Sequence, residues 1–471
     1  MRIAIVSTFF GHCGIANYTR HLATALTGAG VEVEIIAEDV WRPSTLWYPL
    51  AIFAGICRSK PDVVHFQHEY LLFGKGEYGL LLLPLLALLR TFGKTIIITM
   101  HSVVPLNQLT PNLFEEYTRR KHFSQLKKIG VFALTKCLSI LSQRMIVHTE
   151  TARSILLEDY DVSPGKVTTV FHGATVRPSA AMRAKDDDLV LCVGFVKPSK
   201  GIETLLRAMK DVCVNHPKVR LLIAGEAPEN CATGLAYSQH LVEISKDLGI
   251  SNNVTFDFRF VPEDELDALI ASANIVVLPY RDMVHGESGV LKRVASFGKP
   301  VVVSDAPKFM GVLEDRKNAL FFPVDDSKHL AGCIERLLMD PLLAATLSSN
   351  LKVLAMKQSW RNVALKMWET YSEVKGEGRE IWAPALPFET EPAFEVDYPE
   401  RLSDEWLTTS NIGIVGARAG SNFKSEIDRT RFNDYVPDFD DTQHLSRDTV
   451  LSTVILKQNP RPKRKSIGVD E

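Results

Sequence analysis

The sequence predicts an α/β protein with two Rossmann-like, doubly wound domains that face each other across a cleft, followed by a C-terminal extension. Two observations lead to this fold class. Short apolar runs recur along residues 2–171 and again along 189–305, and most of them are separated by segments of helix length. Alternation of buried strands with helices is typical of parallel sheets covered on both faces. After residue 375 this alternation stops, which predicts a segment without a core of its own.

Length and composition describe a large globular protein. The 471 residues leave room for about two to three domains. The 54 basic and 56 acidic side chains nearly balance, which argues against a dedicated nucleic-acid protein. The seven cysteines are odd in number, dispersed and without a CxxC pair, so neither a disulfide framework nor a zinc knuckle is expected. A reducing cytoplasm fits this usage.

The first domain is expected over residues 1–172. The apolar run 2–8 predicts a strand, and the following segment repeats apolar residues at helical spacing until Gly28 and Gly30 stop it. That helical face comprises Ile15, Tyr18, Leu22, Ala25 and Leu26. The run VEVEII follows, so strand, helix and strand form a βαβ unit. Further strands are predicted at 63–67, 95–100, 144–148 and 167–171.

No signal peptide and no membrane-spanning segment is expected in the first domain. The opening MRIAIVSTFF is interpreted as a strand, because it lacks the basic, apolar and cleavage regions of a signal peptide. The most apolar run, 78–89, is too short to cross a bilayer and contains Pro84. It is expected to form a buried helix.

The second domain is expected over residues 189–358, after a polar linker at 173–188. An amphipathic helix at 359–374 closes it. The second series of strands is predicted at 189–194, 219–225, 253–258, 274–279 and 300–305. Residues 375–471 hold 13 basic and 18 acidic side chains and no long periodic stretch, which predicts an extended or partly disordered tail.

Two lysines follow the first strand of the second domain. Lys197 and Lys200 stand in the loop after Gly194, just before Gly201 opens a helix. Two ammonium groups beside a helix N-terminus can neutralise a diphosphate as it binds and as it departs. The alternative is that both are ordinary solvated lysines, since surface lysine is common.

A second candidate is the loop HGESG, which leads into a later helix. Glu287 could accept hydrogen bonds from sugar hydroxyls, and the amides of Ser288 and Gly289 could hold a phosphate. The alternative is a capping motif, with Ser288 as the N-cap and Glu287 solvated. Lys292 and Arg293 on that helix are expected to be exposed charges.

In the first domain the candidates stand just after strands, where ligands of such sheets bind. Gly11 and Gly14 would let the chain approach a ligand, although they form no complete GxGxxG motif. His101 could bind a sugar hydroxyl or phosphate, or exchange a proton, or it could be a structural histidine. His68 and Glu69 could bind an acceptor or simply pack, and a metal site there is ranked lower.

With these motifs assembled, the chain resembles a GT-B glycosyltransferase of family 4 over about residues 1–374. The segments that carry the resemblance are CGIANYTRHLATAL, VVHFQHEYLLFGKGEYG, ITMHSVVP, VFHG, GFVKPSKGIETLLRAM, LLIAGEAP, NVTFDF, LPYRD and SGVLKRVASFGKPVVVSD. The family implies a nucleoside-diphosphate sugar held by the second domain and an acceptor held by the first. It also implies retaining transfer without a metal or any other cofactor.

The resemblance assigns roles to individual residues. Lys200 matches the lysine that neutralises the donor diphosphate, His101 the histidine near the donor sugar, and Gly14 the glycine loop under the phosphates. Glu287 to Gly289 match the acidic glycine loop, and the helix 359–374 matches the one that crosses back to the first domain. Lys200, His101 and Glu287 are therefore the expected catalytic residues. The expected substrate-binding residues are Gly11, Gly14, His68, Lys197, Gly194, Gly225, Glu226, Arg281, Ser288, Gly289 and Val290.

The sequence also departs from the family pattern. Phe195 stands where many members have an arginine, and His285 and Arg293 stand where many have two glutamates. The second glutamate usually meets the ribose, so a different class of function stays open: a catalytically silent module that binds a nucleotide or glycan. A nucleotide-sugar epimerase or a phosphorylase on the same fold is a third alternative.

The family implies transfer of a hexose, mannose or glucose foremost, to a glycan or lipid-linked acceptor in cell-envelope or exopolysaccharide synthesis. Residues 1–172 carry 17 basic and 13 acidic side chains, a surplus of four, which suits an anionic acceptor or peripheral contact with the inner face of the plasma membrane. The basic stretch 118–128 either rests on anionic lipid or is a solvated helix face. Expected partners are the donor and this acceptor, with no nucleic acid.

Overall fold

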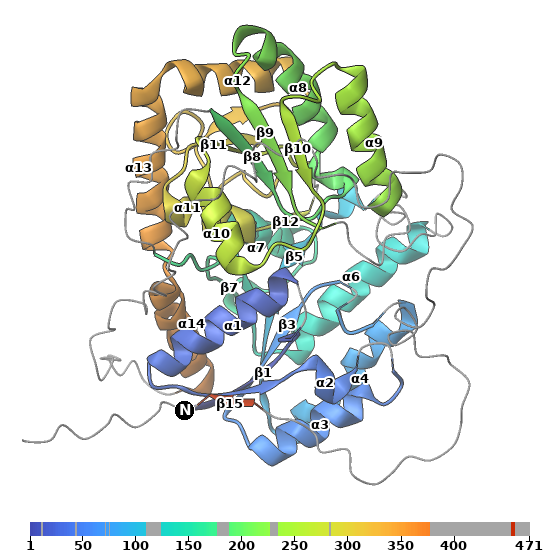
Figure 1. Cartoon of the computed structure of the whole chain (residues 1–471). Coiled ribbons are helices and arrows are strands. Elements are labelled where there is room, and N and C mark those ends of the chain that lie inside the picture. The colour runs from blue at the N-terminus through green and yellow to red at the C-terminus, as the bar shows by residue number, and fades with distance from the viewer. Residues whose placement is uncertain are drawn as a thin grey trace, which may run out of the picture. The chain divides into compact units, whose positions relative to one another are not determined.

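The computed structural model describes residues 1–10, 13–42, 45–70, 72–74, 76–109, 124–176, 188–226, 234–281, 284–376 and 454–456 (Figure 1). Several sequence predictions fall outside these residues. They are Gly11, the first part of the basic stretch 118–128, most of the linker 173–188 and nearly all of the tail 375–471.

The first half of the chain builds one parallel sheet with strand order β2-β1-β3-β4-β6-β7. A short strand from the tail, β15 (Val454–Leu456), pairs antiparallel with β2 at the edge. The elements in chain order are β1 (Arg2–Val6), α1 (Gly14–Gly28), β2 (Glu32–Ile36), α2 (Glu38–Trp41), α3 (Tyr48–Ser59), β3 (Val63–His68), η1 (Gly76–Leu81), α4 (Leu82–Thr91), β4 (Thr95–Met100), β5 (Ser102–Val103), η2 (Leu106–Gln108), α6 (Ser124–Leu141), β6 (Arg144–Val147), α7 (Glu150–Glu158), η3 (Pro164–Lys166) and β7 (Val167–Thr169).

The chain reverses direction across this sheet between β1 and β3, because β2 adds on one side of β1 and the later strands add on the other. The carboxyl ends of β3, β4, β6 and β7 consequently lie side by side along one edge. Residues that follow these strands are thus brought together although more than a hundred positions separate the first from the last.

The apolar run 78–89 does not form a single buried helix, so that prediction was wrong in part. Residues Gly76–Leu81 form the 3-10 helix η1, and α4 begins only at Leu82. Pro84 falls in the first turn of α4, where a missing N–H costs no helical hydrogen bond. Leu80 is half exposed, while Leu82, Leu85, Leu86 and Leu89 are buried. Among the described residues no helix is long and apolar enough to span a bilayer.

The second half builds a separate parallel sheet with strand order β10-β9-β8-β11-β13-β14. In sequence order this is 3-2-1-4-5-6, the Rossmann arrangement, with its reversal between β8 and β11. The elements are β8 (Leu189–Val193), η4 (Pro198–Lys200), α8 (Ile202–Asn215), β9 (Arg220–Ala224), α9 (Gly234–Asp247), β10 (Val254–Asp257), α10 (Glu263–Ser272), β11 (Ile275–Leu278), β12 (His285–Gly286), α11 (Gly289–Phe297), β13 (Val301–Ser304), β14 (Leu320–Phe322), α12 (Ser327–Met339), α13 (Pro341–Lys357) and α14 (Trp360–Lys375).

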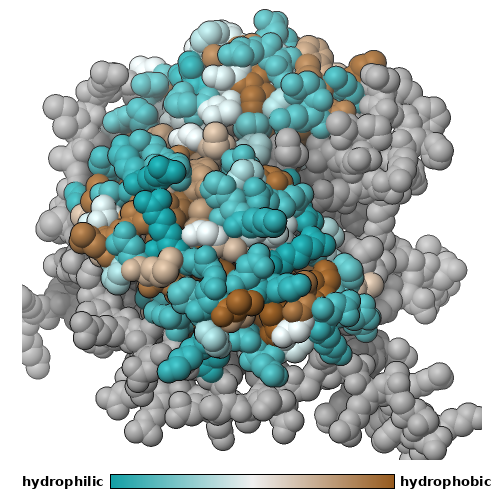
Figure 2. Space-filling model, turned by 90° about the horizontal axis from the view of Figure 1, so that it is seen from above, coloured by the Kyte–Doolittle hydropathy of each residue, from teal (hydrophilic) through white to brown (hydrophobic). Residues whose placement is uncertain are grey.

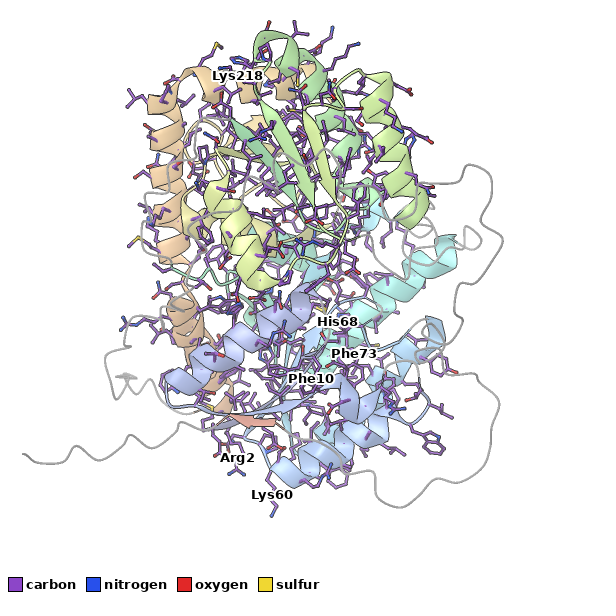
Figure 3. The ribbon with its side chains drawn as sticks, viewed as in Figure 1. Arg2, Phe10, Lys60, His68, Phe73 and Lys218 are labelled. Carbon is purple, nitrogen blue, oxygen red and sulfur yellow. The ribbon has the colours of Figure 1, made fainter. Side chains whose placement is uncertain are left out.

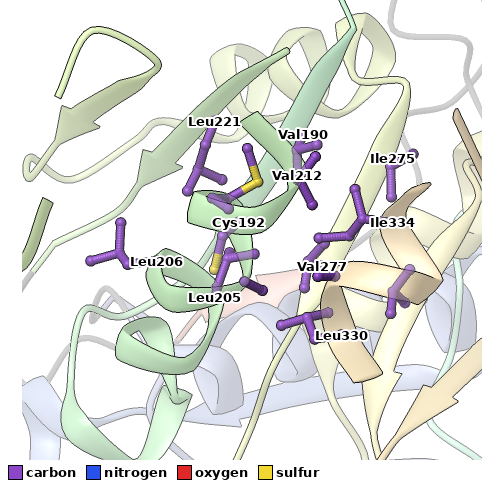
Figure 4. Packing of buried hydrophobic residues seen from close by; sticks show 14 of the residues in the cluster. Val190, Cys192, Leu205, Leu206, Val212, Leu221, Ile275, Val277, Leu330 and Ile334 are labelled. Carbon is purple, nitrogen blue, oxygen red and sulfur yellow. The ribbon is translucent and has the colours of Figure 1, made fainter. Parts of the chain in front are cut away.

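Each face of this second sheet has its own apolar core. On one face α8 and α12 pack on the strands, and Figure 4 shows Leu205, Leu330 and Ile334 meeting Cys192 and Val277 there. On the other face α10, α11 and α13 supply their apolar residues. The surface view in Figure 2 is mainly polar, with apolar side chains in small separate patches. Burial on both faces explains why the strands are continuous apolar runs rather than alternating ones.

The last helix returns to the first sheet. Helix α14 packs beside α1 (Figure 1), and Val363, Met367 and Tyr371 join the core around Ile3. At the start of α14, Trp360 lies against Gly173, where a Cβ atom would come within 2.2 Å of the indole. Only glycine at 173 leaves room for this ring. The return of α14 thus completes the core of the first half.

Two glycines allow loops of the second sheet to touch. Gly201 has φ +64°, and a Cβ there would lie 1.9 Å from the carbonyl oxygen of Pro279. Gly225 has φ +140°, and a Cβ there would lie 2.1 Å from the carbonyl oxygen of Gly194. Both glycines therefore supply a left-handed conformation and a close approach at once.

Replacing Gly201 with alanine should test this close approach. We expect Gly201→Ala to lower the free energy of unfolding by about 3 kcal/mol or more, because the clash adds to the left-handed strain. Gly249 has φ +72° with nothing within 4 Å of its Cβ position, so Gly249→Ala should cost only about 1 kcal/mol. Urea unfolding of both variants measures the difference. Equal losses would show that the contact with Pro279 does not matter.

Candidate active site

A row of histidines lies at the carboxyl edge of the first sheet. His68 ends β3, while His101, His148 and His172 follow β4, β6 and β7. The ring centroids of His101 and His148 are 5.0 Å apart, and those of His148 and His172 are 5.9 Å apart. Tyr18 of α1 packs on all three of these rings at 4.8 to 5.1 Å. Helix α1 and three strands thus enclose one imidazole cluster.

His101 uses both of its ring nitrogens within the protein. Its Nε2 lies 2.9 Å from Oε1 of Gln67, and its Nδ1 lies 3.2 Å from Nε2 of His148. Burial lowers the pKa of His101 well below its ordinary value, and the neighbouring His148 and His172 lower it further. Burial also lowers the pKa of His148 to about 4. The cluster is therefore uncharged at neutral pH.

The ring of His68 packs on rings other than those of this cluster, while its backbone carbonyl accepts from the N–H of His101 at 3.0 Å. Its ring stacks on Phe73 with centroids 6.3 Å apart, and Figure 3 shows the two residues together. Burial lowers its pKa to about 4, and its Nδ1 atom has no hydrogen-bond partner. Among the described residues no group of three or more histidine, cysteine, aspartate or glutamate side chains is placed to hold a metal ion. The structure thus packs His68 among aromatic rings.

In the second half, two loops meet at the reversal of the sheet. The loop after β8 carries Lys197 and Lys200 to the start of α8, and the loop after β11 carries Tyr280 and Arg281. The ammonium of Lys200 lies 3.4 Å from the centroid of the Tyr280 ring. Such a cation–π contact stabilises the charge without neutralising it. The backbone N–H of Arg281 donates to the carbonyl of Ser199 at 2.8 Å, which ties the two loops together.

The guanidinium of Arg281 is held by its own domain. It pairs with Asp325, with Glu203 at 3.2 Å and with the hydroxyl of Thr204 at 3.2 Å. Gly225 and Glu226 lie beside the loop after β8, since the N–H of Val196 donates to the carbonyl of Glu226 at 2.9 Å. These contacts shape the loops at the ends of β8, β9 and β11.

At the start of α11, two side chains for which the sequence suggested solvated positions, Glu287 and Lys292, are buried. Ser288 is the N-cap of α11, and its hydroxyl accepts from the N–H of Leu291 at 3.2 Å. Glu287 is not solvated: its side chain is fully buried, and Oε2 pairs with the ammonium of Lys292 at 2.9 Å. Lys292 is likewise buried, not an exposed helix charge, and also donates to Gln358. The ion pair makes both burials tolerable.

Arg293 also differs from its expected exposed state. Its guanidinium pairs with the fully buried carboxylate of Asp267 and with Glu263 at 3.3 Å, both on α10. Apolar periodicity gave no sign of these pairs, because buried charges on a short helix look the same in sequence as solvated ones.

The two halves of the chain touch at the loop before α11. His285 and Gly286 of β12 pair antiparallel with Val103 and Ser102 of β5. Gly286 lies so close to the backbone of His101 that a Cβ would come within 2.4 Å of its carbonyl oxygen. These backbone contacts fix the loop next to His101.

Side chains continue this contact. The N–H of His172 donates to Oε2 of Glu287 at 2.9 Å, and the Cβ position of Gly289 lies 3.7 Å from Nε2 of His172. Val290 lies 3.6 Å from the Cβ position of Gly194. The structure thus brings Gly194, Glu287, Gly289 and Val290 together with the histidine cluster. Gly14 begins α1, whose N-cap is Cys13.

Sequence reasoning missed several members of this site. His148 stands immediately after β6, the same signal that singled out His101, and His172 stands three residues after the end of β7. Gln67 is the last residue but one of β3 and carries an amide rather than an ionisable group. In the sequence, Lys292 looks like a residue on an exposed helix face, and Tyr18 looks like an ordinary core residue. Position after a strand was therefore the one usable signal for the missed histidines.

Two family models match the chain side by side. Residues 13–176 match glycosyltransferase family 4, and residues 179–353 match glycosyl transferases group 1. The D-inositol 3-phosphate glycosyltransferase of Salinispora arenicola is 27% identical over 255 residues, which cover 49% of this chain and 55% of that protein. The enzyme of the same name from Frankia alni is 30% identical over 244 residues, covering 49% and 58%. The chain thus spans little more than half the length of these relatives.

Known structures share the fold at low identity. HepE of Anabaena in complex with UDP superposes with a TM-score of 0.59 at 16% identity, covering 79% of this chain and all of HepE. Sucrose-phosphate synthase of Thermosynechococcus elongatus superposes with a TM-score of 0.62 at 20% identity, covering 80% and 99%. Other HepE structures hold UDP-glucose, or UDP and glucose. At these identities the likeness shows the two-sheet fold.

The pair of Glu287 and Lys292 should couple strongly in stability. We expect Lys292→Met to lower the free energy of unfolding by about 3–5 kcal/mol, because it leaves a buried carboxylate without its cation. The double variant Glu287→Gln with Lys292→Met should recover much of that loss. Urea unfolding at pH 7 measures the coupling. The exposed pair Lys366–Glu369 is the control, and Lys366→Met should change stability by less than about 1 kcal/mol. Simple additivity at the buried pair would contradict its role.

The buried histidines should make stability depend on pH. Burial lowers the pKa of His65 to about 3 and those of His68 and His148 to about 4, from an ordinary value of 6.5. As the pH falls, these histidines are protonated in the unfolded chain near pH 6.5 but stay neutral in the folded chain. The free energy of unfolding is therefore highest above pH 6.5 and decreases as the pH drops from 6.5 towards about 4. Each histidine should add a slope of about 1.4 kcal/mol per pH unit in this window.

Unfolding by urea between pH 7 and pH 5 measures that slope. The variant His65→Asn should show a slope smaller by about 1.4 kcal/mol per pH unit, whatever its stability at pH 7. The exposed His240→Asn is the matched control, because its side chain is solvated in both states. If the slope of His65→Asn equals that of the unaltered protein, His65 is not a source of the pH dependence.

Proposed function

The chain belongs to the GT-B glycosyltransferases of family 4, and on that premise we propose that it moves a hexose from a nucleoside-diphosphate sugar to a glycan or lipid-linked acceptor with retention of configuration. The observation that supports this most directly is the meeting of the Lys200 loop and the Tyr280 loop at the reversal of the second sheet. Ligands of open α/β sheets bind at such reversals. HepE, which shares the fold, binds UDP and UDP-glucose, and this supports a nucleotide-sugar donor.

The donor diphosphate would be neutralised from the second half. The ammonium of Lys200 lies above the face of Tyr280, and Lys197 stands on the same loop. Two positive charges beside the leaving group stabilise the negative charge that develops as the bond to the sugar breaks. The ring of Tyr280 would orient the side chain of Lys200 before the donor binds. Lys200 would then lose less conformational entropy when it binds the phosphates.

The start of α11 would supply neutral donors to the same phosphates. The N–H groups of Gly289 and Val290 are in the first turn and have no partner within the helix. Val290 also contacts Gly194 at the end of β8, which places this helix start near the loop that carries the lysines. A phosphate between them would meet the positive end of the helix dipole.

In this mechanism the acceptor hydroxyl attacks from the face on which the diphosphate departs, and a phosphate oxygen of the leaving group takes its proton. In this proposal the base is the phosphate oxygen and not Glu287, whose Oε2 is bound by Lys292 and by the backbone N–H of His172 and whose Oε1 is buried without a hydrogen-bond partner. We assign Glu287 instead to holding the loop before α11 in place. His101, neutral and buried, would orient a sugar hydroxyl rather than carry charge.

The acceptor would bind the first half. The relatives act, by their names, on D-inositol 3-phosphate. Exposed apolar residues on this half, Trp47 and Leu50 around the start of α3 and Phe92 after α4, suit peripheral contact with the inner face of a membrane. We therefore propose that mannose or glucose transfer takes place at the cytoplasmic side of the membrane, in cell-envelope or exopolysaccharide synthesis.

Loss of the Lys200 charge should slow the reaction. A thermal-shift panel of UDP-, GDP- and ADP-sugars first identifies the donor, and release of nucleoside diphosphate then measures turnover. We expect Lys200→Ala to lower kcat by on the order of 10²-fold or more. The exposed Lys246→Ala on α9 is the matched control and should keep full activity.

Two outcomes would contradict this proposal. Full activity of Lys200→Ala would remove the lysine from the reaction. Stabilisation by a sugar nucleotide without any turnover of the unaltered protein would favour a silent binding module instead. Because Lys200→Ala also loses its contact with Tyr280, the melting temperature of each variant is recorded beside its rate.

A further inference from the structure

Four hydrogen-bonded groups in a line fix the orientation of His101. Nδ1 of His148 lies 2.9 Å from the carbonyl oxygen of Val170, and Nε2 of His148 lies 3.2 Å from Nδ1 of His101. On its other side, Nε2 of His101 lies 2.9 Å from the side-chain amide of Gln67. His148 and Gln67 are completely buried, so the line is closed to solvent along most of its length.

The carbonyl of Val170 sets the direction of the protons along this line. A carbonyl oxygen only accepts, so Nδ1 of His148 carries a proton and donates it. A neutral imidazole has one N–H, which leaves a lone pair on Nε2 of His148. That lone pair needs a donor, so Nδ1 of His101 carries the proton between the two rings. The position of one backbone carbonyl thereby decides the tautomer of a histidine two steps away.

The same reasoning determines the amide of Gln67. A neutral His101 protonated at Nδ1 has a lone pair on Nε2, and the amide must donate to it. In the orientation seen, the amide oxygen faces Nε2 of His101. Because that oxygen only accepts, Nε2 would need a proton in addition to the one on Nδ1, and His101 would then be an imidazolium. The two ends of an amide have nearly the same shape, so a half-turn presents the NH₂ group without new packing. The half-turn leaves the oxygen of Gln67 facing Nε2 of His65, at the 3.3 Å contact.

His65 completes this arrangement with neutral groups only. Its Nε2 lies 2.7 Å from the hydroxyl of Thr99, and its Nδ1 lies 2.8 Å from the hydroxyl of Tyr371 on α14. With the proton on Nε2, His65 donates towards Gln67 and Thr99 and accepts from Tyr371. Each of these contacts then joins one donor to one acceptor, as a completely buried network requires. Helix α14 thus supplies, through Tyr371, the last hydrogen bond of this network.

We propose that Gln67 and His148 are positioning residues that hold His101 in its neutral, Nδ1-protonated form and so reserve Nε2 as a hydrogen-bond acceptor for a substrate hydroxyl. The role of His101 towards substrate rests on the proposed function. Neither Gln67 nor His148 touches the substrate itself. In the free protein the amide of Gln67 occupies Nε2 of His101 at 2.9 Å, and a sugar hydroxyl takes the place of its N–H when the substrate binds. His148 is held by Val170 and keeps the ring of His101 oriented meanwhile.

The first test reads the tautomer directly and needs no activity. The full chain is labelled with ¹⁵N-histidine, and His101→Gln assigns the His101 signals. We expect Nδ1 of His101 to be protonated and Nε2 to carry the lone pair between pH 6.5 and pH 8. In Gln67→Glu the new carboxylate only accepts, so Nε2 becomes protonated and His101 becomes an imidazolium. Protonation at Nε2 in the unaltered protein would overturn the proposal.

The second test separates positioning from general stability. Gln67→Leu should lower kcat by about 10-fold or more while the KM for the donor changes by less than about threefold. In Gln67→Glu the carboxylate raises the pKa of His101. On acidification, the activity of this variant should therefore fall at a pH at least about one unit higher than that of the unaltered protein. Ser142→Ala removes another buried hydrogen bond, to the carbonyl of Leu138 at 2.8 Å, and should change neither quantity.

The outcomes distinguish this inference from the proposed function. If the unaltered protein turns over a donor but Gln67→Leu and Gln67→Glu match Ser142→Ala in rate and pH profile, the positioning role is wrong and the function stands. If no donor is turned over but the ¹⁵N signals show the expected tautomer and its reversal in Gln67→Glu, the function is wrong and the hydrogen-bond direction stands.

Discussion

The burial of Glu287 beside Lys292 is the interaction on which the site depends. A carboxylate without solvent needs a cation and hydrogen bonds, and Oε2 receives them from Lys292 and from the backbone N–H of His172, while Oε1 has no hydrogen-bond partner. Lys292 and His172 belong to different halves of the chain. The ion pair holds the carboxylate in place, the hydrogen bond from His172 ties it to the edge of the first sheet, and the short pairing of β12 with β5 extends that contact along the backbone.

From this contact follows a division of chemistry between the two halves. The first half presents imidazoles whose pKa values are lowered by burial, so it offers uncharged hydrogen-bonding groups. The second half presents ammonium groups on loops at the reversal of its sheet, with Lys200 held above Tyr280. Under the proposed function, the first environment would bind uncharged sugar hydroxyls and the second would bind the diphosphate. The fold creates both environments by directing the carboxyl ends of parallel strands to one edge.

Most strands were predictable because each is a continuous apolar run, as sheets buried on both faces require. The structure has a strand at each of the ten runs assigned by residue range and at VEVEII, with ends shifted by one or two residues. Among the described residues it adds the three-residue strands β14 and β15 and the two-residue strands β5 and β12; β15, β5 and β12 each pair with a partner far away in sequence. The 3-10 helix η1 was missed because apolar content alone does not distinguish it from an α-helix.

The sequence by itself determined the two-sheet fold, the family, and the placement of His101, Lys200 and Ser288 at the ends of strands or the start of a helix. Apolar periodicity and glycine positions are local properties, so they can be read without a structure. Only the tertiary structure decided that Lys292 and Glu287 are buried, that Arg281 is tied to Asp325, and that His148 and Gln67 surround His101. Burial and hydrogen bonding of a polar side chain depend on which distant segments pack against it, and spacing along the chain carries no record of that.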